Sequence, residues 1–461
     1  MLSEVARCVS GRTRALAWNI ALISWVARVE HSSGQTMPAN SLVVLIYSTL
    51  RWPLAARLAI CFCDLGATVH AICPAVHPLR FVAGIDRCHS IRSWSVPHSL
   101  IRAIDASKAD YIVPADDRAI WQLHALAASH PQYRELIVRS LGDLSSFETV
   151  RSRTNLLALA ESLEIQTPRT ASLRTLEEAT SYAASSSYPA VVKRDGTSGG
   201  RGVVVVRTAE ELLDAFKRLR RTVSFSARAK RRLVDDDVLA FSETDALLPQ
   251  EISLQDFVIG APANAMYACF SGELLASLQV RTVCAQHAAG AALIVERIND
   301  QRLDEAGRKL AKALGLSGFF GLDFLLENHS GHPYLLEMNP RATQLGHLLL
   351  ENQIHGRTLA EALWLAWTGN RSPRTDAVPT PVKLPQRIAF YPQALVLGIN
   401  NSLLTSAWMD RPDNEPALLK ELSQAGWPER RLLYRLFHRL YAVPADQPVL
   451  FSNSESSSKL R

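Results

Sequence analysis

Residues 321–341 read GLDFLLENHSGHPYLLEMNPR, and this stretch decides the fold. Two apolar, strand-like runs flank a turn-rich segment at 328–333, a pattern typical of two antiparallel strands. Because side chains alternate between the faces of a strand, Glu337 and Asn339 point the same way, and Asp323 lies opposite them if the runs pair. Two carboxylates and one amide oxygen are a ligand set suited to Mg²⁺. The stretch therefore predicts a metal site formed by Asp323, Glu337 and Asn339.

Arg341 follows the second run, one position beyond Pro340. A guanidinium at this place can hold a transferring phosphate or an anionic acyl phosphate. The competing interpretation is that Asp323 and Glu337 are ordinary surface acids beside a turn. Both acids stand inside apolar runs, where burying an unpaired charge is costly, so we favour metal ligation.

A second stretch, residues 191–203, reads VVKRDGTSGGRGV. It places Lys193 at the end of a strand-like run, and four glycines, among them Gly199 and Gly200, follow before the next run. Glycines let backbone N–H groups approach phosphate oxygens without a Cβ in the way, and Lys193 can add its charge there. The stretch is not a P-loop, because the lysine precedes the glycines. It favours a phosphate site over its alternative, an ordinary glycine-rich hairpin.

The chain before these motifs alternates between strand-like and helical patterns. Apolar runs at 42–47 and 69–73 enclose a helical pattern, and a further run at 111–113 precedes Asp116 and Asp117 at a helix N-cap position. This alternation predicts a Rossmann-like parallel sheet. No G-x-G-x-x-G follows the first run, which disfavours a dinucleotide site and a dehydrogenase.

The composition is that of a globular protein of 461 residues with a formal net charge of +6. A positive excess can indicate nucleic-acid binding. Its only dense cluster, residues 228–232, is followed at once by Asp235, Asp236 and Asp237, so we interpret it as a solvated loop of both signs and expect no nucleic-acid partner. Seven scattered cysteines are typical of free thiols in a reducing compartment, and they predict a cytoplasmic protein.

An apolar stretch at 15–26 follows three arginines near the N-terminus. It is shorter than the ~20 residues that span a bilayer, although it has features of a signal or transit peptide. The other interpretation is an upstream extension, with the domain proper beginning after Met37. We expect residues 1–40 to be an extension and disfavour a membrane-associated protein.

Taken in this order, the two motifs resemble the ATP-grasp superfamily, which includes carbamoyl phosphate synthase, biotin carboxylase and D-alanine–D-alanine ligase. The run from Glu337 to Arg341 is most similar to carbamoyl phosphate synthase, although Asp323 stands where that enzyme usually has Glu or Gln. The resemblance covers residues 146–367 and implies an α/β and α+β architecture. The expected parts are an N-terminal extension (1–40), a Rossmann-like pre-ATP-grasp domain (41–145), a two-lobed ATP-grasp domain (146–368) with a mobile insertion (222–248), and a linker with a small, mostly helical C-terminal region and a disordered tail (369–461).

The resemblance also implies nucleotide-binding residues. Gln255, Phe257 and Val258 match the hinge strand that holds adenine, with a hydrogen bond from Gln255 and apolar and main-chain contacts from the other two. The alternative for all three is a plain buried strand. Arg153 matches an upstream phosphate-binding cation, and Arg151 competes for that role; otherwise both are surface charges of a helix.

The chain departs from the family after the hinge. The family usually has a glutamate there that binds the ribose hydroxyls, whereas Gly260 is here followed by Ala-Pro-Ala and Asn264. Asn264 is the expected substitute, but a neutral residue weakens the contact. This departure favours a rival hypothesis, a nucleotide-binding regulatory protein without turnover.

Three further residues have open roles. Arg281 and Glu296 are expected to face one cleft, where Arg281 binds the carboxylate substrate or the γ-phosphate, or else forms a structural ion pair with Glu296. His347 is expected on the surface of a helix that begins at Thr343.

The sequence thus predicts an ATP- and Mg²⁺-dependent ligase, with Mn²⁺ as an alternative cation. It activates a small-molecule carboxylate as an acyl phosphate for attack by an amine, with Lys193, Arg281 and Arg341 as catalytic residues. A single ATP-grasp unit argues against a full carbamoyl phosphate synthase. The sequence leaves the identity of both substrates, and a homodimer, open.

Overall fold

The computed structural model describes most of the chain, and Leu42–Arg461 forms one compact unit. The N-terminal extension, Gly199, Gly200 and most of the expected linker lie outside the described residues. The described residues are 42–197, 202–221, 223–242, 251–288, 290–351, 356–369, 384–441 and 448–451.

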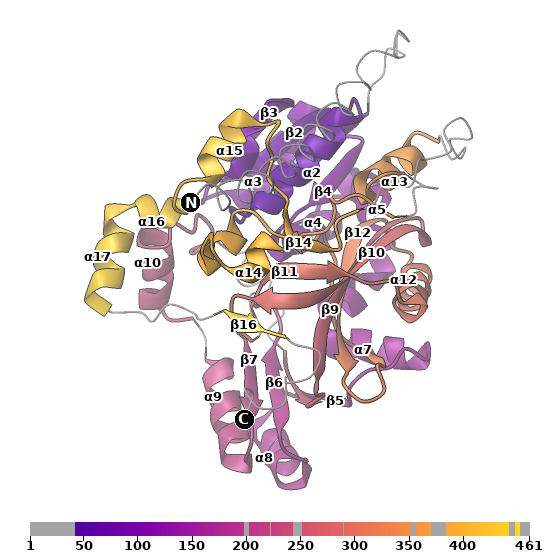
Figure 1. The fold of residues 1–461 in the computed structure, drawn as a ribbon, viewed down its shortest axis with the longest axis vertical. Helices are drawn as coiled ribbons and strands as arrows, with labels where there is room; N and C mark the ends of the chain where they lie inside the picture. The colour runs from indigo at the N-terminus through magenta and orange to yellow at the C-terminus, as the bar shows by residue number, and fades with distance from the viewer. Residues whose placement is uncertain are drawn as a thin grey trace, which may run out of the picture. The chain divides into compact units, whose positions relative to one another are not determined.

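The N-terminal sheet is parallel, with the strand order β3-β2-β1-β4, which confirms the Rossmann-like prediction (Figure 1). Both faces of β1 are covered: Val44 and Ile46 belong to one apolar cluster with α2, and Leu45 and Tyr47 to another with α3 and α4. The elements are β1 (Val43–Tyr47), α2 (Pro53–Asp64), β2 (Thr68–Cys73), β3 (Ile85–Ser90), α3 (Val96–Ser107), β4 (Tyr111–Pro114), α4 (Asp117–Ser129) and α5 (Arg134–Leu141).

The start of α4 is fixed by its cap. The carboxylate of Asp116 accepts a hydrogen bond from the backbone N–H of Ala119 at 3.1 Å, as an N-cap residue does. The same carboxylate accepts from the backbone N–H groups of Thr49 and Leu50, so it joins the loop after β1 to the first turn of α4. This turn therefore lies at the carboxyl ends of the parallel strands, where sheets of this kind place their functional residues.

A small antiparallel sheet follows, in the order β5-β8-β6-β7. Helices α8 and α9 pack on the face that carries Val192 and Leu254. Because side chains alternate, Lys193, Ser253 and Gln255 lie on the opposite, helix-free face. The elements are α6 (Phe147–Arg151), α7 (Arg153–Ser162), β5 (Thr170–Leu173), α8 (Leu176–Ser185), β6 (Ala190–Arg194), β7 (Val203–Val206), α9 (Ala209–Arg220) and β8 (Ile252–Asp256).

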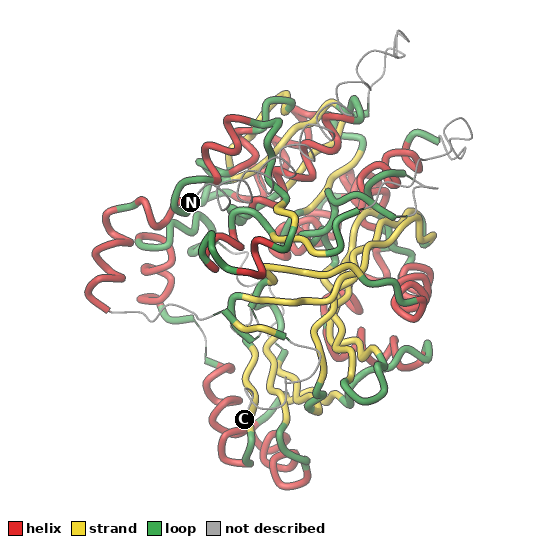
Figure 2. Tube along the Cα trace, viewed as in Figure 1, coloured by secondary structure: helices red, strands yellow, loops and turns green. Residues whose placement is uncertain are grey.

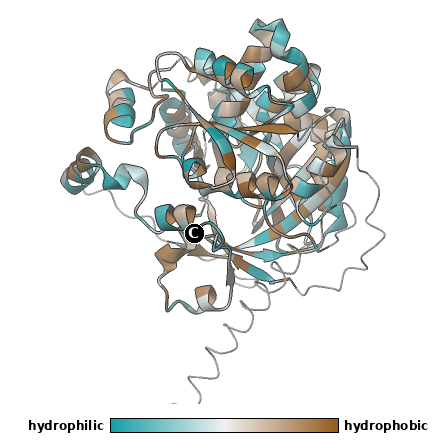
Figure 3. Ribbon diagram, turned by 90° about the horizontal axis from the view of Figure 1, so that it is seen from above, coloured by the Kyte–Doolittle hydropathy of each residue, from teal (hydrophilic) through white to brown (hydrophobic). Residues whose placement is uncertain are grey.

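The large sheet forms the second of the two expected lobes, and the antiparallel pair predicted from residues 321–341 lies at its edge. Its strand order is β13-β12-β9-β10-β11-β14-β15, with β16 paired to β10. Strands of this sheet are drawn in yellow in the middle of Figure 2. Several helices of the structure carry hydrophobic and hydrophilic residues side by side, as expected of helices that pack on one side and meet solvent on the other (Figure 3). The elements are β9 (Gly260–Phe270), β10 (Glu273–Ala285), β11 (Ala292–Arg297), α12 (Gln301–Ala313), β12 (Gly318–Glu327), β13 (Pro333–Asn339) and α13 (Leu359–Trp367).

The C-terminal region is mostly helical, as expected, but it also supplies strands to the large sheet. Ile388 of β14 pairs with Val295 of β11, so this region extends the large sheet. Its elements are β14 (Arg387–Ala389), α14 (Ser402–Thr405), β15 (Trp408–Met409), α15 (Pro416–Leu422), α16 (Trp427–Arg430), α17 (Leu432–Tyr441) and β16 (Val449–Leu450).

Two local predictions are corrected. The insertion expected to be a mobile loop contains helix α10 (Phe225–Leu233), whose basic residues pair with the acidic residues that follow it. The helix expected from Thr343 is absent from residues 343–351, which form turns. The leucines of this stretch are buried in one apolar cluster with α2 and α13, so tertiary packing takes precedence over the helical pattern; they are Leu345, Leu348 and Leu350.

Among the described residues, no helix is long and apolar enough to cross a membrane. The six described cysteines are free thiols, in agreement with the reading of the sequence.

Candidate active site

Two strands of the large sheet bring the predicted metal ligands together. Asp323 on β12 stands opposite Glu337 on β13, and Asn339 is two residues farther along β13 on the same face. The side-chain amide of Asn339 donates to Oδ2 of Asp323 at 3.0 Å. The expected convergence is therefore present, while the role of these residues as metal ligands stays a prediction.

Asn264 belongs to this group and not to the ribose contact that the sequence assigned to it. It lies on β9, opposite Asp323 in the strand register, and its amide donates to Oδ1 of that carboxylate. The amide is thus engaged in the metal-site region, and its role as a ribose substitute stays a prediction. The sequence shows that Asn264 interrupts an apolar strand, but not which strand lies beside it.

The two carboxylates have opposite pKa shifts. Burial, together with the Glu337 carboxylate, raises the pKa of Asp323 to about 7. Burial alone would raise the pKa of Glu337 as well, but Arg153 and Lys193 outweigh it and lower that pKa to about 2. Glu337 keeps 35% of its side chain exposed, so it remains reachable for an incoming ion. The neighbouring cations therefore stabilise the ionised form of Glu337, whereas burial disfavours the ionised form of Asp323.

Two cations face these carboxylates. Burial lowers the pKa of Lys193 to about 8 although Glu337 and Asp323 favour its charged form. Arg153 bridges two elements, with its guanidinium 2.5 Å from Oδ1 of Asp195 and 2.6 Å from Oε2 of Glu337. We call Arg153, Lys193, Asp195, Asp323 and Glu337 the cleft cluster. Its three carboxylates outnumber its two cations, so a divalent cation fits its charge.

Arg153 and Arg151 are the two candidates for the upstream phosphate-binding cation, and their contacts differ. Arg151 lies over the ring of Trp121, 5.8 Å from its centroid, and 3.9 Å from Glu148. Arg153 instead contacts the predicted metal ligand directly. The predicted phosphate-binding cation thus pairs with two carboxylates.

Arg341 is held by a residue of the N-terminal domain. Its Nε donates to Oδ1 of Asp117 at 2.9 Å and its Nη2 to Oδ2 at 3.2 Å, while Nη2 also donates to Oδ1 of Asn339 at 3.1 Å. The arginine therefore lies beside the metal-site region, as predicted, but its carboxylate partner is Asp117 at the start of α4.

The hinge residues lie between the two lobes. Phe257 and Val258 form the connection from β8 to β9 and are half-buried, so the predicted strand ends earlier, at Asp256. The side chain of Gln255 is buried and donates to Oγ1 of Thr170 at 3.0 Å. The neighbouring buried hydroxyl of Ser253, on the same face as Lys193, has no hydrogen-bond partner among the described residues. An orphaned polar group there is consistent with a ligand that completes its hydrogen bonding.

Two other predicted residues have structural partners. Arg281 donates to Glu296 at 2.8 Å across β10 and β11, so the ion-pair alternative is present, while the catalytic role of Arg281 stays a prediction. His347 is half-buried in the turns at 343–351 and contacts Asp410 at 2.9 Å, so it is not a helix-surface residue. Burial lowers the pKa of His347 despite this carboxylate.

A hollow lies where these elements meet. The described residues hold no group of three or more His, Cys, Asp and Glu side chains suited to a metal, so a cation here depends on the mixed carboxylate and amide set. The hollow is lined by Asp117, Trp121, Val150, Arg151, Arg153, Leu156, Asp195, Gly196, Thr197, Glu337, Met338, Asn339 and Pro340.

The sequence did not indicate Asp117, Asp195 or Ser253 as site residues, and it assigned Asn264 to a ribose contact. Asp117 looked like part of a helix cap, and Asp195 like an ordinary loop residue beside the glycines. Their contacts join residues far apart in the chain; 224 positions separate Asp117 from Arg341. Only the docking of the domains brings them together.

Comparisons with known proteins agree with this geometry. Residues 152–363 match the family described as carbamoyl-phosphate synthase L chain, ATP binding domain. Pyruvate carboxylase from Pichia angusta is 28% identical over 176 residues, which are 38% of this chain and 14% of that protein. Acetyl-CoA carboxylase 2 from Oryza sativa subsp. japonica is 26% identical over 183 residues, 40% of this chain and 7% of that protein. The chain thus matches only a small part of each of these curated relatives.

Solved structures show the same fold. The biotin carboxylase domain of 2-oxoglutarate carboxylase from Hydrogenobacter thermophilus, in complex with MgADP, ADP and bicarbonate, has a TM-score of 0.52 at 17% identity, covering 72% of this chain and 70% of that one. N5-carboxyaminoimidazole synthetase from Staphylococcus aureus has a TM-score of 0.51 at 15% identity, covering 74% and 80%. Residues 152–363 are therefore similar to the ATP binding domain of the carbamoyl-phosphate synthase L chain, and the chain shares the fold of these solved structures.

Proposed function

We propose that the protein is an ATP-dependent ligase that phosphorylates a small carboxylate and joins the resulting acyl phosphate to an amine. The observation that carries the proposal is the cleft cluster, in which opposite charges from both lobes meet at one hollow. Strongly perturbed groups in a cleft are typical of functional sites. The solved relatives with MgADP and ADP support the choice of nucleotide and cation.

Asp323, Glu337 and Asn339 are the residues that would hold Mg²⁺, or Mn²⁺ in its place. Their oxygen donors and the raised pKa of Asp323 fit a hard divalent cation, which when bound supplies charge neutralisation for the phosphates. Lys193 adds a positive charge from the small lobe, and Arg341 adds one from the other side. These side chains do the work of positioning and electrostatic stabilisation that phosphoryl transfer requires.

The reaction has two balanced steps. An oxygen of the substrate carboxylate attacks the γ-phosphorus of ATP, and ADP leaves with the electron pair of the broken P–O bond. The amine nitrogen then attacks the acyl carbon, phosphate leaves, and the nitrogen loses one proton. Water has to be excluded between the steps, because it would hydrolyse the acyl phosphate.

An ADP-release screen tests the proposal. The full-length protein is incubated with ATP and Mg²⁺ over a panel of amino acids and small acids, alone and in pairs with amines. We expect ADP release that requires both an acid and Mg²⁺. Calorimetric ATP binding with no ADP release over the whole panel would support the rival, a regulatory protein without turnover.

The assembly and location are part of the proposal. The relative from Hydrogenobacter thermophilus is described as a domain dimer, which supports testing this chain for a homodimer by light scattering. Free thiols at the described cysteines support a cytoplasmic location, which fluorescence microscopy of a tagged chain would check.

A further inference from the structure

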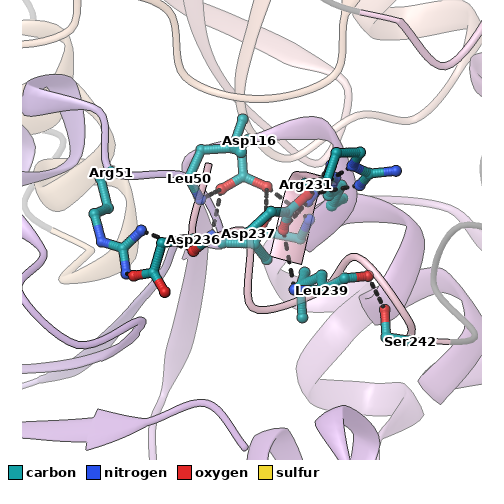
Figure 4. A network of polar contacts seen from close by, with 11 residues as sticks. Leu50, Arg51, Asp116, Arg231, Asp236, Asp237, Leu239 and Ser242 are labelled. Carbon is teal, nitrogen blue, oxygen red and sulfur yellow. Dashed lines mark hydrogen bonds and ion pairs between the residues drawn. The ribbon is translucent and has the colours of Figure 1, made fainter. Parts of the chain in front are cut away.

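Two adjacent residues in the first turn of α4 each form a bidentate ion pair, with two different parts of the chain. Asp117 contacts Arg341 of the large lobe, at 2.9 and 3.2 Å. The next residue, Arg118, contacts Asp237 at 3.0 and 3.1 Å. Asp237 belongs to residues 235–239, which we call the docking turn and which follow α10 (Figure 4). One helix start of the N-terminal domain thus contacts both the site and the insertion.

The guanidinium of Arg341 contacts four residues. Besides Asp117, it donates to the side-chain oxygen of Asn339 and to the backbone oxygen of Ala342, both at 3.1 Å. The ring of Trp52 lies 5.3 Å from its central carbon, in the geometry of a cation–π contact. Only 8% of the Arg341 side chain is exposed. Its position is therefore set by its contacts and not by solvent.

Asp117 contributes most to this placement. It is the one carboxylate among the Arg341 contacts described above, and a bidentate pair fixes the plane of a guanidinium as well as its distance. Its side chain is 26% exposed and lines the same hollow as Glu337 and Asn339. Asp116, its neighbour, is buried and anchors the turn to the loop after β1, so Asp117 stands on a rigid support.

We propose that Asp117 is a positioning residue of the phosphoryl-transfer site, which aligns Arg341 beside the metal-site residues from outside the ATP-grasp domain. The inference rests on the proposed function and names a further residue for it. Asp117 acts through Arg341. It holds the guanidinium plane next to Asn339, on the side where negative charge develops as the γ-phosphoryl group transfers. The N-terminal domain is then a component of the reaction centre and more than a support.

The test compares Asp117→Asn with Asp237→Asn. The first change keeps the size of the side chain but removes the charge that orients Arg341. The second breaks the matching ion pair of Arg118 on the same helix turn without touching Arg341. We expect Asp117→Asn to lower kcat by ~10–10²-fold, as misplacement of a reacting-site group does, with little change in KM for ATP. Asp237→Asn should leave both constants close to wild type, and Asp117→Glu should recover part of kcat.

A binding measurement keeps this inference separate from the ligase proposal. Affinities for ADP, and for ADP with beryllium fluoride as a γ-phosphoryl mimic, are measured by calorimetry with Mg²⁺. We expect Asp117→Asn to weaken only the complex with beryllium fluoride. Equal losses for both ligands, or the same kcat loss in Asp237→Asn, would overturn the role of Asp117. If wild type releases no ADP over the whole panel, the ligase proposal fails, and the calorimetric result still decides the role of Asp117.

Discussion

The cleft cluster and the docking turn are both built from arginines and carboxylates, but their charges are balanced differently. In the docking turn, Asp237 has two guanidinium partners, Arg118 and Arg231, which outweigh burial and lower its pKa to about 2. In the cleft cluster, the pKa of Asp323 rises to about 7 and that of Lys193 falls to about 8, mainly through burial. A carboxylate that is fully paired with arginines indicates a structural role. Buried charged groups with strongly shifted pKa values, as in the cleft cluster, indicate a ligand-binding site.

The docking turn also has an apolar anchor, which fits a structural role. Leu239 is fully buried in the cluster that covers the outer face of the parallel sheet, and the hydroxyl of Ser242 donates to its backbone oxygen at 2.9 Å (Figure 4). By contrast, none of the side chains of α10 is buried. The docking turn therefore joins the insertion to the N-terminal domain through Asp236, Asp237 and the buried Leu239.

The largest effect is expected from Glu337→Gln in the cleft cluster. The change removes the charge that pairs with Arg153 and that would bind the cation, so turnover should fall by at least ~10²–10³-fold. ADP release under saturating ATP and Mg²⁺ measures it. Glu327→Gln on the same pair of strands is the matched control, because Glu327 only contacts the exposed Ser330. Wild-type turnover in Glu337→Gln would remove the basis of the metal assignment.

A smaller effect is expected from Lys193→Gln. The buried ammonium faces Glu337 and Asp323, and its loss should raise the KM for ATP about tenfold, equivalent to ~1.4 kcal/mol of binding. Arg194→Gln is the control, since the neighbouring Arg194 points away and donates to the backbone oxygens of Leu219 and Arg221. Equal KM values in the two variants would contradict a phosphate-binding role for Lys193.

Breaking the docking turn should change stability and leave turnover almost unaltered. Asp237→Asn removes a carboxylate with two arginine partners and should lower the free energy of unfolding by about 1–3 kcal/mol, the value of hydrogen bonds to charged groups. Urea unfolding measures the loss. A large drop in kcat at unchanged stability would show that the docking turn belongs to the reaction centre and would erase the contrast between the two clusters.

The smallest effect on turnover is expected from His77, which lies beside the loop after β1. Its Nδ1 accepts from the N–H of Leu79 at 3.0 Å, and its Nε2 lies 2.7 Å from the oxygen of Leu50, so a second proton would face a donor. Burial lowers its pKa to about 3, whereas the unfolded value is ~6.5. Between these values the unfolded chain binds more protons, and stability falls as pH falls, by up to about 1.4 kcal/mol per pH unit.

Unfolding free energies at pH 7 and pH 5 check this prediction. His77→Gln should show a weaker pH dependence than wild type, with unchanged turnover at pH 7. The dependence does not vanish, because burial also lowers the pKa of His124 to about 3. Identical pH dependence in the two proteins would show that His77 does not report on folding.

Local patterns allowed much of the fold and part of the site to be predicted. Alternation along two short runs was enough to bring Asp323, Glu337 and Asn339 together, because a tight antiparallel pair depends on nearby residues. The parallel sheet followed from the same kind of local signal. The family resemblance then supplied the order of the domains.

Contacts between distant segments could not be predicted. The partner of Arg341 is on another domain, and the neighbour of Asn264 depends on which strand joins β9. The helix expected at Thr343 is absent for a related reason. The backbone N–H of Thr343 donates to the sulfur of Met266, and the chain turns so that its leucines join an apolar cluster with α2 and α13. In each case tertiary packing overrides the local pattern.

The central claim is that oxygen donors from β12 and β13 hold a divalent cation beside the nucleotide. A crystal of the full chain grown with ADP and Mn²⁺ tests it through the anomalous signal of manganese. The account predicts a peak within bonding distance, ~2.1 Å, of oxygens of Asp323, Glu337 and Asn339. A manganese peak elsewhere, with these three side chains bound only to protein atoms, would contradict it.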